Sequence, residues 1–236
     1  MKKVYLMVMS VLISACSAVT TFEVRSLDSE IEVYEGKQVV IKQDEVLETS
    51  LSYEFYDDIG FVFFLYVKNL SDDYITLDPE KMFFENVVET DSQLTAVNSF
   101  HIINPEYELE NLDKATENVK GEKDINKTLC CISTGANIIG IFISDNDKEG
   151  KIGAVFDDLE EYGMREEELE EELEIIHQRK MYWRNEVFRR KTLAPDEDYG
   201  GLIYLPMEAV SERFRINIKN EFSIHRYNYE KITVTN

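Results

Sequence analysis

Apolar and polar residues alternate through much of the first half of the chain, and this pattern predicts β-strands. Leu51, Tyr53 and Phe55 fall on one face at a spacing of two residues. Residues 61–67 are apolar almost throughout, as in a strand that is buried on both faces. Polar turn clusters such as residues 69–73 separate these segments. Short strands at this spacing predict a β-sandwich.

After residue 104 the apolar residues recur every three or four positions, which predicts helices. A stripe of this kind covers residues 125–143, although its two glycines leave residues 138–143 open to a strand instead. The strongest helical pattern covers residues 164–190, which contain no proline or glycine. Acidic residues gather near its start and basic residues near its end, and this arrangement complements the helix dipole.

This long helix carries an imperfect heptad seam. Apolar residues fall seven apart in two columns, which Glu166 and Lys180 interrupt. We expect the seam to pack in a hairpin or bundle with the earlier helices, or else against a second copy of the chain. The seam consists of Tyr162, Leu169, Leu173, Ile176, Trp183 and Val187.

Strand character returns after residue 200, so the helical block lies between two β segments. The sequence therefore predicts an α+β protein. We expect residues 28–103 and 200–236 to form the β-sandwich. Residues 104–199 would be an insertion, a helical hairpin or bundle with one long helix. Residues 16–27 would form a tether before the first strand.

The first sixteen residues have the pattern of an export signal. Two lysines precede an apolar run of about ten residues, which is too short to span a bilayer as a helix. Ile-Ser-Ala-Cys follows at residues 13–16, and the whole segment resembles a bacterial lipoprotein signal with its lipobox. The resemblance implies that residues 1–15 are a signal peptide and that Cys16 is lipidated, with palmitate among its acyl chains. An ordinary secretory signal, with Cys16 incidental, is the alternative.

The net negative charge of the chain makes some classes of binding partner unfavourable. The chain has 47 acidic residues against 25 lysines and arginines, a net charge of −22. Such a field repels phosphate backbones and anionic lipids, so nucleic acid is not an expected partner. The lipid on Cys16 would then be the membrane attachment. Residues 17–22 are uncharged, which favours an outer-membrane protein that faces the periplasm and leaves surface exposure open.

Two further segments share features with known proteins. Residues 61–84 contain Val-Lys-Asn, Ile-Thr-Leu and Asp-Pro, and residues 190–206 read Arg-Lys-Thr-Leu-Ala-Pro, then Gly-Gly and Leu-Ile-Tyr-Leu-Pro. Together they resemble uncharacterised bacterial envelope lipoproteins with an immunoglobulin-like β-sandwich. The resemblance implies a helical insertion that ends in a helix containing Trp183 and Phe188. Asp196 departs from the glycine that is more usual in that group. These are turn and core residues, so they bear on fold more than on function.

No motif in the chain indicates a particular reaction. The three histidines lack metal-ligand spacing, and there is neither a nucleophile elbow nor a glycine-rich phosphate loop. We therefore expect a non-catalytic binding or scaffold module of the cell envelope. Its partner would be another envelope protein or a second copy that meets it through the long helix. An envelope hydrolase that acts on glycan or peptide through paired carboxylates is the alternative.

One acidic segment resembles the start of a calcium loop. Asp145, Asp147 and Glu149 occupy the first, third and fifth positions, and Gly150 follows at the sixth. The twelfth position holds Phe156 in place of the expected glutamate. A polar turn between two helices is the alternative. No other cofactor is expected.

Overall fold

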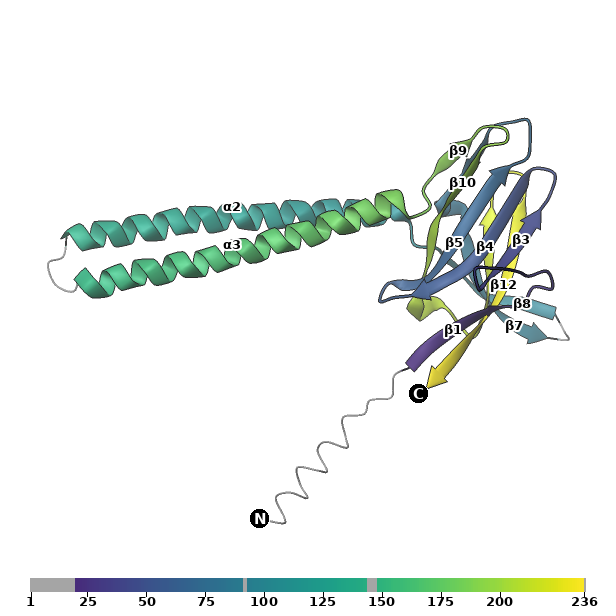
Figure 1. The fold of residues 1–236 in the computed structure, drawn as a ribbon, viewed down its shortest axis with the longest axis horizontal. Helices are drawn as coiled ribbons and strands as arrows, with labels where there is room; N and C mark the ends of the chain where they lie inside the picture. The colour runs from purple at the N-terminus through teal and green to yellow at the C-terminus, as the bar shows by residue number, and fades with distance from the viewer. Residues whose placement is uncertain (1–19, 91–92, 144–147, 236) are drawn as a thin grey trace, which may run out of the picture. The chain divides into compact units, whose positions relative to one another are not determined.

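The computed structural model describes residues 20–90, 93–143 and 148–235, without the side chains of residues 20, 129–162 and 235 (Figure 1). The chain divides into two compact units, which are described separately. The first comprises the chain up to Ile103 together with Phe188–Asn236, and the second is Asn104–Val187. Antiparallel sheets dominate the first unit and two helices form the second, so the predicted α+β class is confirmed.

The first unit contains two five-stranded sheets and a small two-stranded sheet, and every strand pair is antiparallel. The first sheet has the order β1 (Thr20–Ser26), β12 (Ile224–Thr235), β11 (Arg213–Lys219), β7 (Phe83–Thr90) and β8 (Gln93–His101). The second has the order β10 (Asp198–Pro206), β5 (Gly60–Asn69), β4 (Leu47–Tyr56), β3 (Lys37–Gln43) and β2 (Glu32–Tyr34). The small sheet pairs β6 (Ile75–Leu77) with β9 (Lys191–Leu193), and the 3₁₀ turns are η1 (Pro79–Lys81) and η2 (Met207–Ala209).

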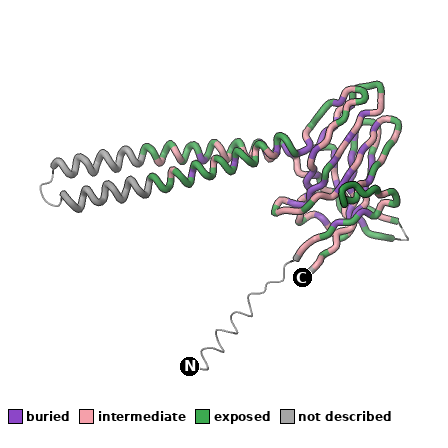
Figure 2. Tube along the Cα trace, viewed as in Figure 1, coloured by how far each residue is buried: buried purple, intermediate pink, exposed green. Residues whose placement is uncertain are grey.

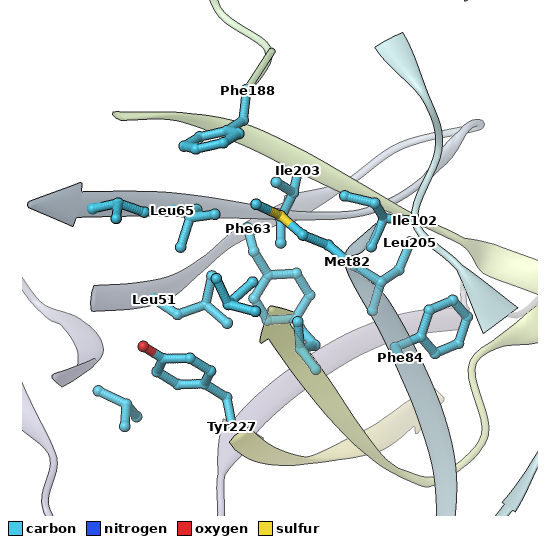
Figure 3. Packing of buried hydrophobic residues seen from close by; sticks show 14 of the residues in the cluster. Leu51, Phe63, Leu65, Met82, Phe84, Ile102, Phe188, Ile203, Leu205 and Tyr227 are labelled. Carbon is cyan, nitrogen blue, oxygen red and sulfur yellow. The ribbon is translucent and has the colours of Figure 1, made fainter. Parts of the chain in front are cut away.

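The two large sheets pack face to face around one hydrophobic core. The ring of Phe63 on β5 lies 6.1 Å from that of Phe214 and 5.0 Å from that of Tyr229, both on the first sheet. Figure 3 shows Phe63 among the core residues Leu51 and Leu65. Alternate residues of a strand point to the same face, so Leu47 and Leu51 of β4 both reach this core. The described β unit is therefore a two-layer sandwich. The predicted face does not continue to Phe55, which follows a register shift in the pairing with β5 and is 43% exposed.

The second unit is an antiparallel helical hairpin of α2 (Pro105–Ile143) and α3 (Lys148–Asn185) (Figure 1). Val119 of α2 packs with Leu169 and Ile176 of α3 in a small buried cluster. Most of the described helix surface is otherwise exposed (Figure 2). Ion pairs join the helices, with Lys123 Nζ 2.5 Å from Glu170 Oε1. Among the described residues, no helix is long and apolar enough to cross a membrane.

Several boundaries differ from the sequence expectation. The long helix starts at Lys148 rather than near residue 164, and it ends at Asn185. Residues 188–199 belong with the sheets instead of the helical insertion. Residues 20–26, expected within the tether, form β1 because they pair with β12. Residues 138–143 are helical, not a strand.

A buried asparagine joins two segments that are far apart in the sequence, residues 61–84 and residues 190–206. Asn69, at the end of β5, is fully buried. Its Nδ2 donates to the carbonyls of Asp73, Leu193 and Ala194 at 2.7, 3.2 and 3.0 Å. Its Oδ1 accepts from the backbone N–H of Ser71 at 2.9 Å. One side chain therefore holds the turn after β5 against the turn after β9.

Candidate functional site

A groove on the outer face of the second sheet is the strongest candidate for a ligand site. Its floor follows β4, where Ser50 and Ser52 point outward with small side chains. Val39 and Ile41 on β3 form one wall, and β5 supplies the other. The hollow measures about 490 Å³, within the range of pockets that hold small ligands. The groove exists because small residues on a central strand lie between larger residues on both neighbours.

The wall from β5 is aromatic. Phe64 lies opposite Ser52 and Tyr66 lies opposite Ser50. The Phe64 ring leans over β10 at Gly200, where an added Cβ atom would lie 2.8 Å from the ring carbon Cζ. The absence of a side chain at Gly200 thus gives the ring room on the sheet, and Phe64 remains 39% exposed. An exposed aromatic ring on a rigid sheet is a ready contact for an apolar or cationic group.

The charges around the groove are mainly negative. Glu32, Glu35 and Glu54 line it together with Lys37. Lys37 is the one basic residue in this lining, and its ammonium is paired with the Glu54 carboxylate. At the aromatic wall, burial and a hydrogen bond with Asp198, together with nearby negative charge, raise the pKa of the Tyr66 hydroxyl. The groove therefore presents apolar walls within a negative field, which favours cationic ligands.

A second hollow, of about 520 Å³, lies where β3 approaches β12. His225 is in its wall, and His225 Nε2 lies 3.0 Å from Asp44 Oδ2. On the other side of the ring, Nδ1 lies 2.5 Å from Thr49 Oγ1. Thr49 Oγ1 also contacts the Tyr227 hydroxyl, which donates to the Thr49 carbonyl at 3.0 Å. The result is a chain of polar groups that joins the two sheets.

This acid–imidazole–hydroxyl order is shared with hydrolase triads, but the surroundings differ. Thr49 is fully buried, so its hydroxyl cannot reach a substrate. Asp28, another acid in the wall, accepts hydrogen bonds from the backbone and side chain of Asn228 and pairs with Lys42. The geometry fits a polar network that holds two sheets together.

Acid should weaken this network. Burial acts to raise the pKa of the Asp44 carboxyl, but hydrogen bonds from the N–H groups of Leu47 and Val46, and from His225, outweigh it and lower the pKa. A lowered folded-state pKa stabilises the fold above the unfolded value of 3.8, and this contribution is lost as the pH falls through the folded-state pKa. We expect Asp44→Asn to be less stable than wild type near neutral pH and to lose less stability on acidification. Urea midpoints of both proteins near pH 7 and about pH 3 measure the difference. Equal losses in the two proteins would contradict the role of Asp44.

No protein-family model and no curated protein matches the chain.

The structure describes only some of the site residues that were predicted from the sequence. Cys16, Asp145 and Asp147 lie outside the described residues. Glu149 is in the first turn of α3, and its side chain is not described. In the parts of the chain that the structure describes, no group of three or more His, Cys, Asp or Glu residues could hold a metal ion.

The central part of the helix seam faces the other helix of the hairpin. Leu169 and Ile176 are buried against Val119, and Leu173 packs at the edge of the same cluster. Trp183 is also buried, whereas Val187 is buried but lies beyond the end of α3 at Asn185, so its assignment to the helix was wrong. The side chain of Tyr162 is not described. Intramolecular packing therefore occupies the central seam positions, which were considered as a surface for a second copy.

The groove was missed in the sequence. Its residues come from four strands, and each strand shows only the ordinary alternation of a half-buried sheet. The alternation alone places Ser50 and Ser52 on one face of their strand, and Phe64 and Tyr66 on one face of theirs. Only the register shows that these two faces are the same face of the sheet. The register depends on strand pairing, which a single sequence does not reveal.

Proposed function

We propose that the protein is a membrane-anchored bacterial lipoprotein that acts as a non-catalytic binding module of the cell envelope. The lipid on Cys16 would hold the β-sandwich at the outer membrane, facing the periplasm. The groove over β4 would bind an extended, positively charged segment of another envelope protein. The observation that carries this proposal is the groove itself, with apolar walls, a serine floor and an acidic lining.

The shape and charge of the groove support this choice of ligand. An extended peptide matches a depression that runs along one strand between two walls. Its aliphatic and aromatic side chains would contact Ile41 and Phe64, which are 37% and 39% exposed. Its lysines or arginines would meet Glu32 and Glu35, for which the described residues provide no ion pair.

At a finer level of fold, we propose that the sandwich is immunoglobulin-like. The two facing antiparallel sheets are compatible with that architecture, and the envelope-lipoprotein resemblance favours it. The helical hairpin would then be an insertion between two strands of that sandwich. This assignment concerns architecture and adds no catalytic role.

The envelope hydrolase remains the alternative. It requires acids that converge on a bound substrate at a suitable separation. Asp28 and Asp44 in the hollow at His225 instead have protein partners, and the groove acids include one that is paired with Lys37. Binding therefore explains the arrangement with fewer added assumptions than catalysis.

A large side chain placed in the groove should weaken the binding of a cationic peptide. We expect the full chain in detergent micelles to bind a labelled peptide of alternating lysine and valine. Ser52→Trp should weaken that binding at least ~10-fold, because the new ring occupies the floor between the walls. Fluorescence anisotropy at near-physiological salt measures the affinity.

Two controls separate the groove from general attraction to an acidic protein. Thr233→Trp places the same ring at an exposed position of β12 and should leave binding unchanged. A peptide with glutamate in place of lysine should not bind. If Ser52→Trp and Thr233→Trp bind the lysine peptide equally, the groove is not its site.

A further inference from the structure

Strand β8 differs from the other strands in its lack of charge. It covers nine residues, Gln93–His101, and contains no Asp, Glu, Lys or Arg, although 31% of the chain is charged. Among described strands longer than three residues, it alone has this property. Its residues 95–99 are all exposed, and Val97 is 56% exposed. An uncharged, exposed strand on a very acidic protein is a candidate contact surface.

The outer edge of β8 is open to pairing. Within the described residues, β8 pairs with β7 alone and lies at the end of its sheet. Its backbone N–H and C=O groups on the far side therefore offer a template for another strand. The register with β7 shifts by one residue at Val97, which has no Cα partner on β7. Regular pairing continues on both sides of that position.

The other three edges of the two large sheets carry features that discourage pairing. β1 contains Glu23 and Arg25, and β2 has only three residues. β10 is covered in part, because the backbone N–H groups of Ile103 and Phe188 donate to its carbonyls at 2.9 and 2.8 Å. Charges, short length, coverage and β-bulges are the usual protections of edge strands. β8 has no charge, no cover and a length of nine residues, and its one protective feature is the bulge at Val97, with regular pairing on both sides of it.

The charges beside β8 are neutralised within the chain. Its neighbour β7 carries two acidic residues, Glu85 and Glu89. Glu85 lies 3.7 Å from Arg215, measured between Oε2 and Nη1, and Glu89 pairs with Arg213. Val88 of β7 adds an exposed apolar side chain next to the edge strand. The charges on strands β7 and β8 are thus neutralised in a protein with a net charge of −22, and Asp91, between the two strands in the sequence, is the one further acidic residue of this hairpin.

We propose that two copies of this chain pair through their β8 strands, antiparallel and about a two-fold axis, to form one continuous sheet. We choose a second copy as the partner of β8 because the negative charge of both copies disfavours the other contacts that they could make with each other. Each copy carries a net charge of −22, so most contacts between copies place like charges together. At β8 two identical neutral strands meet without that penalty. A two-fold axis makes the contact self-complementary and closes the assembly at a dimer.

A charge placed at the edge tests the proposal. We expect the full chain in detergent micelles to show a concentration-dependent dimer in analytical ultracentrifugation. Val97→Lys should weaken that dimer at least ~10-fold, because the two-fold axis brings two added charges close together. Val33→Lys is the matched control, since Val33 is 72% exposed on the edge strand of the other sheet. The control should dimerise as the wild type does.

Hydrogen exchange shows which strand forms the contact. Backbone amides of residues 95–99 should become more protected as the wild-type concentration rises, and those of Val97→Lys should not. A monomer at all accessible concentrations would overturn the proposal. A dimer that Val97→Lys leaves intact, with β8 amides still exchanging freely, would place the contact elsewhere and overturn it too. Neither result depends on the groove over β4.

Discussion

Replacing Asn69 with alanine is expected to destabilise the sandwich by about 3 kcal/mol. The amide of Asn69 satisfies three backbone carbonyls, and its oxygen satisfies the N–H of Ser71. Each of these groups loses a partner in Asn69→Ala, and the residue itself is fully buried. Leaving a buried backbone group unpaired costs more than an average hydrogen bond contributes. Urea denaturation followed by near-ultraviolet circular dichroism measures the loss.

Two further variants make this result specific. Asn69→Asp keeps the shape but replaces the amide donors with a carboxylate, so it should also be strongly destabilised. Asp72→Ala changes an exposed residue of the same turn and should alter stability by less than about 0.5 kcal/mol. If Asn69→Ala unfolds at the same urea concentration as Asp72→Ala, the asparagine is not the link between the two turns.

Replacing Cys16 with serine is expected to release nearly all of the protein from the membrane fraction. A serine hydroxyl cannot take the place of the thiol that the lipid modification requires. The chain has a net charge of −22, so its body offers no general attraction to anionic lipid head groups. Two or more acyl chains give a stable anchor, whereas the loss of all of them leaves none.

Cell fractionation followed by a high-salt wash measures this release. Cys130→Ser is the matched control, because it removes a different thiol and should leave the protein in the membrane fraction. Persistence of Cys16→Ser in the washed membranes would place the anchor elsewhere. The same experiment distinguishes a lipoprotein from an ordinary secreted protein, because a secreted protein would be absent from the membrane fraction in the wild type and in both variants.

The alternation of apolar residues predicted much of the architecture. Leu51 and the apolar run that contains Phe63 were expected in strands of a sandwich, and Leu51 and Phe63 lie in its core. The expectation that this run is buried on both faces was wrong, because Phe64 is 39% exposed on the outer face of the sheet. The change to helical spacing at Asn104 coincides with the start of the second unit. These features are readable because burial imposes a local period, two in a half-buried strand and about three and a half in a helix.

Element boundaries were less predictable. Residues 20–26 form a strand because β12, some two hundred positions later in the chain, pairs with them. Residues 188–199 look like the end of a helical region in the sequence, yet Phe188 is 1% exposed in the sandwich core. In both cases a distant segment supplies the stabilising contact, so local pattern alone does not reveal it.

Some candidate sites could be recognised from the sequence alone, and others required the tertiary structure. The N-terminal signal and the acidic composition are properties of consecutive residues and of simple counts, so they could be recognised without a structure. The groove over β4, the His225 network and the open edge of β8 depend on strand order and register. A shift of one residue would turn Ser50 and Phe64 from the outer face toward the core. Pairing between distant strands therefore created the surfaces on which binding is proposed. The chain's local pattern was sufficient to predict the fold class, whereas the lipid anchor stays a prediction.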